Sequence, residues 1–561
     1  MGRVRRDGNG RFYFLLALPS LAVLILVFLL PLAFNLSRAF FVDGGFTLYL
    51  VKEAFTDGYT WRLLSFTLLQ AFLSSLVSVL VALPGAYLWA NYRFRLKGLM
   101  LSLSSLCFTL PSILVVLGFV IFYGNSGFVN SLWRALTGRD EPIRILYSFR
   151  AIILAHAFLN IPVALNLITG AWSSFPRTLE NASHTLGAGR VRTFLSVTLP
   201  RLRATILSAS LLIFLFCFTS FSIILVLGGG PQYTTLEVEI YRTNNIVLDS
   251  AKASALSLFS FCVNIIIVLL YVLASRSEEG KERAADRAVK ATKLRTRLAL
   301  FLYNTLMLIF ILGPLASIVT RSFISTSKRY GEGFSTRAYQ ELFGLTRSIG
   351  AMGEAFTALL NSLAIALAVA LCSSILALFL SLYIARRRSR LTELVGMFPL
   401  AVSSVTLGLG YYIIKASIGA SSVLVGAITV ILAHLVIALP FAVRTLVPAV
   451  RMNGERTVLA AYTLGAGRMK ALFTVEIPAL RGAIMRAFIF SFALSVGEVN
   501  ATLTLAEGKV VTLPILLYRL INSYNYQGAC AIGTLLILMT LVVFAISQAI
   551  GDGRRKADGK A

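Results

Sequence analysis

Long apolar runs, separated by short polar loops, recur along the whole of this 561-residue chain. A helix that crosses a bilayer needs about 20 consecutive apolar residues, because that length spans the hydrocarbon core. Runs of this length predict twelve membrane-spanning helices in two sets of six. The expected ranges are 12–34, 62–90, 98–123, 150–172, 204–228, 253–275, 298–320, 357–385, 392–415, 422–446, 483–505 and 527–549.

Lysine and arginine residues collect in alternate loops between these runs, and these segments hold 34 of the 52 basic residues. Cytoplasmic loops carry an excess of Lys and Arg, so the pattern predicts that these loops and both termini are cytoplasmic. The formal net charge of +28 is therefore mostly a sign of topology, and no nucleic-acid partner is expected. The basic segments are 1–11, 91–97, 176–203, 276–297, 386–390, 444–481 and 551–560.

An internal repeat relates the two sets of runs. Residues 185–200 match 463–478 at an offset of 278, with eight of sixteen positions identical. We therefore predict an all-α membrane protein of about 12 transmembrane helices, built as two homologous six-helix domains in parallel repeat. The domains are expected at 1–275 and 298–561, joined by a charged cytoplasmic linker at 276–297. Two such halves, related by an axis along the membrane normal, would enclose a central path.

Each half contains one long cytoplasmic loop, 177–200 or 453–478. Each loop begins as a short helix that ends at Gly187 or Gly465, because glycine adopts the left-handed conformation that terminates a helix. Such a helix could dock in a groove of a soluble partner, or it could lie on the membrane surface. Its presence at the same position in both halves favours a partner with two-fold symmetry.

Both loops resemble the E-A-A—G motif of binding-protein-dependent ABC importer permeases. The segments Phe218–Phe221, Leu227–Gln232 and Ser495–Val499 are similar to the fused permeases for ferric iron and thiamine. This resemblance covers nearly the whole chain. It implies that each half is a permease domain whose loop couples to one of two copies of an ABC ATPase subunit. The matching coupling residues are Glu180, Asn181, Ala182, Leu186, Gly187 and Ala188, and then Leu459, Ala460, Ala461, Leu464, Gly465 and Ala466.

The motif glutamate of this family falls on Asn181 in the first half and on Leu459 in the second. Glu180 stands beside the first position, whereas Val458 stands beside the second. In the family that glutamate holds the coupling helix by a charged contact. We therefore expect the two loops to dock with unequal strength.

No phosphate-binding loop of the form G-x-x-x-x-G-K-[ST] occurs in the chain, since Gly508-Lys509 is followed by Val510. We therefore expect no enzymatic activity, no cofactor and no metal site, with ATP bound and hydrolysed by the partner subunit. The resemblance further implies an extracytoplasmic substrate-binding protein as a partner. It also implies a location in the bacterial or archaeal cytoplasmic (inner) membrane.

Glu498 lies inside an otherwise apolar run, with Asn500 close by. A carboxylate at the bilayer centre costs about 2.5–3.5 kcal/mol on insertion scales, so it requires an interior or wet position. Glu498 could line the translocation path and favour a cationic or metal substrate, or it could hold helices together by hydrogen bonds. Ser220 is its repeat partner at offset 278, so the path would be asymmetric.

The sequence thus predicts the permease subunit of an ABC importer that works by alternating access. The resemblance makes thiamine or ferric iron the expected solute. The alternative is a secondary transporter driven by an ion gradient, which would share the two six-helix halves. That alternative does not account for the two Leu-Gly-Ala-Gly loops, and it predicts more intramembrane charge than Glu498 provides.

Overall fold

The computed structural model describes residues 2–42, 45–275, 288–325, 330–346, 350–387, 390–419, 422–453, 456–505 and 510–558. Most of the predicted linker, 276–287, therefore lies outside the described residues.

Helices make up almost all of the first half. Their bounds are α1 (Gly2–Val23), α2 (Leu30–Arg38), α3 (Tyr49–Thr56), α4 (Gly58–Asn91), α5 (Lys97–Thr109), α6 (Ser112–Tyr123), α7 (Phe128–Thr137), α8 (Phe149–Ser173), α9 (Thr178–Thr185), α10 (Arg190–Thr193), α11 (Leu199–Phe218), α12 (Ser222–Leu227), α13 (Leu236–Asn245) and α14 (Ser250–Ser275). Two π-helical segments, Leu24–Leu29 and Phe194–Thr198, join α1 to α2 and α10 to α11.

The second half follows a similar order but, within the described residues, has no counterpart of α7. Its helices are α15 (Leu294–Phe323), α16 (Arg337–Leu342), α17 (Ala355–Arg387), α18 (Arg390–Met397), α19 (Ser404–Ser417), α20 (Val423–Met452), α21 (Arg456–Thr463), α22 (Arg468–Ala471), α23 (Ile477–Gly497), α24 (Asn500–Leu505), α25 (Leu513–Asn522) and α26 (Tyr526–Asp558). A π-helical segment, Leu472–Glu476, again precedes the long helix.

Three short strand pairs occur in the described residues. They are β1 (Phe41–Val42) with β2 (Gly45–Phe46) and β5 (Ile324–Ser325) with β6 (Gly333–Phe334), both antiparallel, and β3 (Tyr92–Arg93) with β4 (Val289–Lys290), which is parallel.

Within the described residues, eleven helices are long and apolar enough to cross a membrane, or twelve if the bent pair α18–α19 counts as one span. This confirms the predicted all-α membrane fold of about twelve spans. Helices prevail because a bilayer offers no water to backbone N–H and C=O groups, which must bond within the segment.

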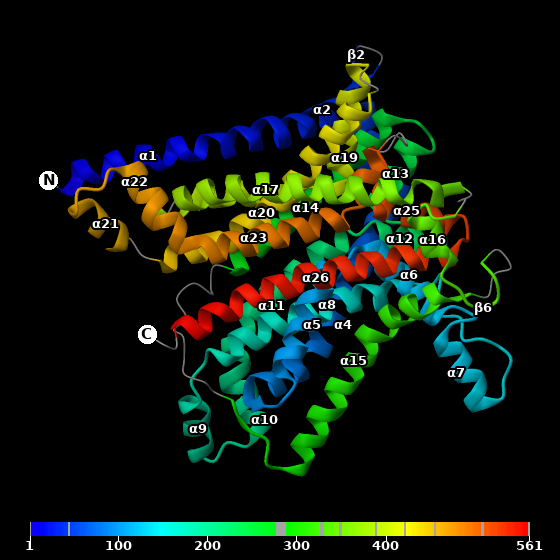
Figure 1. The fold of residues 1–561 in the computed structure, drawn as a ribbon, viewed down its shortest axis with the longest axis horizontal. Coiled ribbons are helices and arrows are strands. Elements are labelled where there is room, and N and C mark those ends of the chain that lie inside the picture. Colours follow the sequence, from blue (N-terminus) through cyan, green and yellow to red (C-terminus); the bar gives the residue numbers. More distant parts are fainter. Residues whose placement is uncertain are drawn as a thin grey trace.

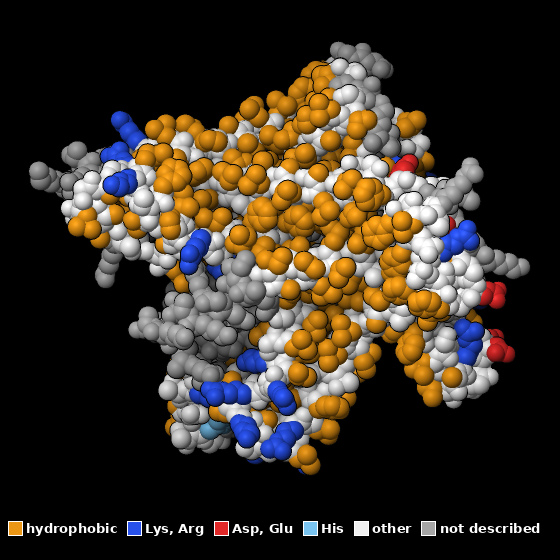
Figure 2. Space-filling model, in the orientation of Figure 1, with side chains coloured by type: hydrophobic (Ala, Val, Ile, Leu, Met, Phe, Trp, Pro, Cys, Tyr) orange, Lys and Arg blue, Asp and Glu red, His pale blue; other side chains and the backbone are white. Residues whose placement is uncertain are grey.

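The two ends of the molecule differ in character. Both termini lie at one end together with α9 and α21, and we call this the loop end (Figure 1). The opposite end, which we call the far end, carries α7, α13, α16 and α25 (Figure 1). Apolar side chains cover the flanks between the two ends, as expected of a surface that faces lipid (Figure 2).

The first helix of each half packs against the other half. Tyr13 of α1 is buried and donates its hydroxyl to the carboxylate of Glu476 at 3.0 Å, and Ser20 bonds to the carbonyl of Leu376. In the same way, Asn304 of α15 accepts a hydrogen bond from the indole of Trp89 at 3.0 Å. Each half therefore holds the other by its first helix.

Four runs that we predicted as continuous spans are broken near their middle. The predicted spans 98–123 and 204–228 divide into α5 and α6 and into α11 and α12. The predicted spans 392–415 and 483–505 divide in the same way, into α18 and α19 and into α23 and α24, and the first of these pairs bends by 94°. The breaks fall at repeat-related places, two in each half.

Candidate functional site

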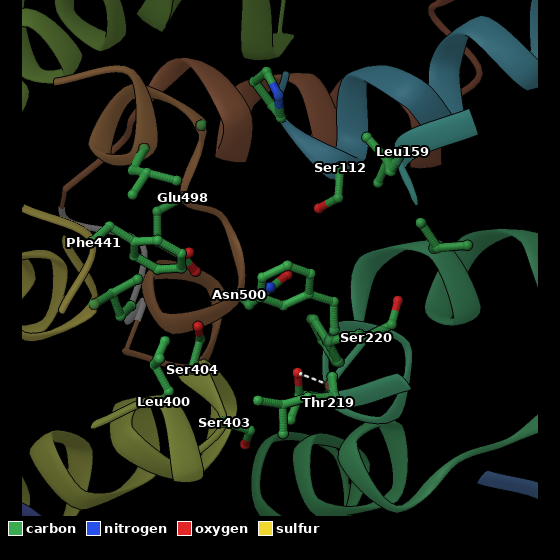
Figure 3. Close-up of a pocket in the computed structure, with 18 of the residues that line it drawn as sticks. Ser112, Leu159, Thr219, Ser220, Leu400, Ser403, Ser404, Phe441, Glu498 and Asn500 are labelled. Carbon is green, nitrogen blue, oxygen red and sulfur yellow. Dashed lines mark hydrogen bonds between the residues drawn. The ribbon is translucent and has the colours of Figure 1, made fainter. Parts of the chain in front are cut away.

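The four helix breaks meet around one cavity of about 270 Å³ (Figure 3). Non-helical backbone at membrane depth is tolerated where protein buries it or where it lines a wet cavity. Residues of both halves line the cavity, so it lies where a central path between the halves would pass. Its polar wall includes Ser112, Thr219, Ser220, Ser403, Ser404, Glu498 and Asn500, and its aromatic wall includes Phe216, Phe221 and Phe441.

Local sequence explains why the helices stop here. Leu110 is extended before Pro111, as residues that precede proline usually are, and α6 starts directly after that proline. Ser403 begins α19 by accepting a hydrogen bond from the N–H of Thr406 at 3.1 Å. Glu498 has an extended backbone, and its carboxylate accepts from the N–H of Ala501 at 3.0 Å. These side chains satisfy backbone groups that the breaks release.

The three residues that we predicted for the path all line this cavity. Ser220 approaches it from the first half, whereas Glu498 and Asn500 approach it from the second (Figure 3). Phe441 lines the same cavity. The carboxylate caps α24 within its own half and also borders the cavity.

One hydrogen bond joins the two halves at equivalent positions of the repeat. The hydroxyl of Ser222 donates to Oδ1 of Asn500, and these two residues are 278 positions apart. That separation is the repeat offset, so the bond lies where the halves face one another beside the cavity. The halves must separate at this bond if the cavity is to open between them.

A chain of hydrogen-bonded polar side chains supports the α11–α12 break of the first half. Ser74 of α4 bonds to Nδ1 of His156 at 3.1 Å, and Nε2 of His156 bonds to the hydroxyl of Ser220 at 2.8 Å. Asn160 donates to the carbonyl of His156, and Gln70 donates to the carbonyl of Cys217 at 2.8 Å. A buried histidine thereby fixes one hydroxyl of the cavity wall.

The second half lacks most of this support. Thr67 of α4 and Ser362 of α17 accept the same backbone hydrogen bond, from Leu236 and Leu513, so these two helices correspond at an offset of 295. The positions equivalent to Gln70, Ser74 and Asn160 are therefore Ile365, Val369 and Ala438. His434, the repeat partner of His156, bonds instead to Ser495 at 2.9 Å and to Thr502 at 2.8 Å, away from the cavity lining. The two sides of the cavity are therefore held by different means.

Glu237 is a further supporting residue that the sequence analysis did not identify. Its buried carboxylate accepts hydrogen bonds from Ser260 at 2.9 Å and from Ser403, which lies at the α18–α19 break. The first half thus stabilises a break in the second half. The signal in the sequence was an acid close to the Thr235-Leu236 pair, which recurs as Thr512-Leu513.

The two predicted coupling loops have the same geometry. In the first, Ala188 N–H bonds to Ser183 C=O and Gly187 N–H to His184 C=O; Ala466 to Ala461 and Gly465 to Tyr462 repeat this pattern. These paired bonds define a Schellman motif, and the glycine φ angles of 83° and 84° satisfy its left-handed position. Leu186 and Leu464, which precede the glycines, are each 88% exposed.

The loops differ in how they are fixed to the spans behind them. In the first half, Glu180 accepts a hydrogen bond from Thr198 at 3.0 Å. In the second half the position of Thr198 is taken by Glu476, which is buried and forms an ion pair with Arg386. The first half therefore carries its acid, Glu180, on the loop helix, whereas the second half carries Glu476 on the span that follows the loop helix. We missed this pair because Arg386 was counted only as a marker of topology.

The remaining coupling residues are placed as follows. Asn181, Ala182, Leu459 and Ala460 are exposed on α9 and α21, whereas Ala188, Ala461 and Ala466 are half-buried at the helix ends. Among the residues that the structure describes, no group of three or more His, Cys, Asp or Glu side chains could hold a metal ion.

Comparison with known proteins places the chain among transport proteins. It matches the family model described as binding-protein-dependent transport system inner membrane component at residues 82–278 and 373–556. It is 30% identical over 547 residues to the thiamine transport system permease protein ThiP of Brucella suis biovar 1 (strain 1330), which covers 94% of this chain and 96% of that one.

Two further relatives span most of the chain. The thiamine transport system permease protein ThiP of Escherichia coli (strain K12) is 28% identical over 511 residues, which covers 90% of this chain and 91% of that protein. The ferric transport system permease protein FbpB of Actinobacillus pleuropneumoniae is 26% identical over 553 residues, 96% of this chain and 78% of that one. The chain belongs to the family of binding-protein-dependent transport system inner membrane components, with the family model matched once in each half.

Proposed function

We propose that this chain is the membrane-spanning permease of an ATP-driven importer of thiamine. The observation that carries the proposal is the cavity at the four helix breaks, whose lining includes Glu498 together with aromatic side chains. Thiamine carries a permanent positive charge on an aromatic ring. A carboxylate and the aromatic side chains of Phe216, Phe221 and Phe441 in the lining suit such an organic cation, by charge and by cation–π attraction. The relatives named as thiamine permeases support the same choice.

Ferric iron is the second candidate, because one relative that spans most of the chain is named as a ferric permease. Iron(III) is a hard cation that oxygen ligands suit, and the cavity offers the Glu498 carboxylate together with serine and threonine hydroxyls. A single carboxylate is a sparse site for a trivalent ion. The apolar and aromatic part of the wall fits an organic ring better.

For the mechanism we infer alternating access driven by two copies of a separate ATPase subunit. Domains 1–275 and 298–561 would each present one coupling loop, 177–200 or 453–478, to one ATPase at the loop end. ATP binding would draw the loops together, and the halves would then tilt about the cavity. The termini would be cytoplasmic, and a substrate-binding protein would deliver the solute at the far end. This chain would itself hydrolyse no ATP.

Each exposed leucine before the loop glycines suits a groove on an ATPase. Because Leu186 and Leu464 are almost fully exposed, they contribute little to the fold of this chain alone. An apolar side chain that a partner buries contributes about 1.5–3 kcal/mol. These two leucines are therefore the residues through which we expect the ATPases to be held.

The Glu498→Gln variant tests the function and its site together. Charged hydrogen bonds contribute about 1.5–3 kcal/mol, so loss of the carboxylate should lower the rate of labelled thiamine uptake by about 10- to 100-fold. Uptake is measured in vesicles containing the complex purified from native membranes with its partner subunits. The matched control is Glu354→Gln, which removes an exposed carboxylate bonded to Arg519 at the far end. Unchanged uptake in Glu498→Gln would exclude the cation site, and uptake of ferric iron without thiamine would select the second candidate.

Replacing each repeat-related histidine separates a role in the cavity from a role in packing. His156→Gln and His434→Gln should lower the free energy of unfolding by similar amounts, about 1–3 kcal/mol, since each leaves buried partners unsatisfied. Only His156→Gln should also slow thiamine uptake, measured with a saturating amount of the thiamine-loaded binding protein. The reason is that only His156 bonds to the hydroxyl of Ser220 in the cavity wall. Ser220→Ala should slow uptake similarly, and the double variant should show little further loss. Equal loss of uptake in both histidine variants would contradict this assignment.

Changing the two exposed leucines tests the coupling loops. Leu186→Asp and Leu464→Asp should each lower recovery of the ATPase subunit with the tagged chain, by about tenfold or more, since burial of an apolar side chain is lost. The melting temperature of the chain alone should not change. Leu345→Asp, at a similarly exposed leucine of the far end, is the control and should retain full recovery.

The two variants also test the expected inequality of the loops. The loop helix of the first half has an acid of its own, Glu180, whereas the equivalent position in the second half is Val458. We therefore expect the two single variants to lose different amounts of ATPase. Equal losses would contradict unequal docking, and full recovery in both would contradict coupling through these loops.

A further inference from the structure

Helix α7 presents its apolar face outward. Phe128, Leu132 and Leu136 recur at every fourth position, so they form one stripe along the helix. Their exposed fractions are 60%, 48% and 76%. A helix packed on a water-soluble protein buries such a stripe and exposes its polar side, and α7 does the reverse.

The polar side of α7 is used for internal packing. Asn130 is fully buried; its amide donates to the carbonyl of Gly124 at 2.9 Å, and its Oδ1 accepts from the N–H of Ile143 at 2.7 Å. Arg134 donates to the carbonyl of Asn125 at 2.7 Å. These bonds fix the rotation of the helix, so the outward direction of the stripe is set by the structure of the loops around it.

Charge and apolar surface are segregated around α7. Apolar side chains gather on the side of this lobe that faces α15, whereas Lys, Arg, Asp and Glu gather along its outer edge (Figure 2). The apolar surface of the spans reaches the same region in this view. Arg139, Asp140 and Glu141, directly after the helix, are exposed. The apolar side of the lobe is therefore on the same side as the apolar surface of the spans, and its charged side chains lie on the opposite edge.

We propose that α7 lies against the bilayer at the far end, with Phe128, Leu132 and Leu136 inserted among the phospholipids. Amphipathic helices bind membrane surfaces in this way, with aromatic residues such as Trp133 at the level of the headgroups. The second half has no counterpart, because only five residues separate α19 from α20. The first half thus gains a contact with the membrane that the second half lacks. This contact does not depend on which solute is carried.

Spin labels attached to single cysteines test the proposal. Labels at Leu132→Cys and Leu136→Cys are compared with a lipid reference, Leu269→Cys on α14, and a water reference, Asp140→Cys. The two exposed native cysteines, Cys262 and Cys372, are first replaced by alanine. The full chain with its partner subunits is reconstituted in phospholipid vesicles, and collision of each label with oxygen and with a nickel chelate is measured.

We expect the two α7 labels to collide with oxygen and to be protected from the chelate, as the Leu269→Cys label is. Accessibility to the chelate equal to that of Asp140→Cys would overturn the proposal. Protection from both probes that appears only when loaded binding protein is added would also overturn it, because the stripe would then be covered by protein. All four sites are exposed, so the labels leave the core packing intact.

Discussion

The need to satisfy backbone hydrogen bonds inside a bilayer is the constraint on which this structure depends. Unbroken helices meet that need along most of the chain. At four places the helices stop, and the released groups are bonded by side chains such as Ser403 and Glu498. Because such breaks are tolerated only inside the protein or beside a wet cavity, their convergence defines the centre of the molecule. The proposed path, the first helix of each half and the two loops are arranged around that centre.

The duplication gives the fold its symmetry, and later divergence gives the site its asymmetry. His156 and His434 occupy equivalent places, yet only His156 reaches the cavity wall through Ser220. Glu498 replaces that serine in the other half, so the cavity has one charged side and one side of hydroxyls. On the proposed path, a solute would therefore meet two different walls. An asymmetric organic cation could be held there in one orientation.

The sequence predicted the spans, the repeat, the loop glycines and the cavity residues Ser220, Glu498 and Asn500. These features could be predicted because the length of an apolar run is a local property and the repeat is found by comparing the chain with itself. The breaks were missed because the runs stay apolar across them, although Pro111 and Pro399 were visible. Two features were missed: the Glu476–Arg386 pair, and the packing of the first helix of each half against the other half. Both depend on which helices, distant in the sequence, pack together. No periodicity within one helix encodes that choice.

Cross-linking the two halves beside the cavity tests the central claim most directly. Ser222 and Asn500 are equivalent in the repeat and bonded across the two halves, so cysteines at both positions should form a disulfide under mild oxidation. The account predicts that thiamine uptake by the oxidised double variant stops and that a reductant restores it, while uptake by each single variant does not change on oxidation. Full uptake by a completely cross-linked chain would contradict it, because the halves would then not need to separate at the helix breaks.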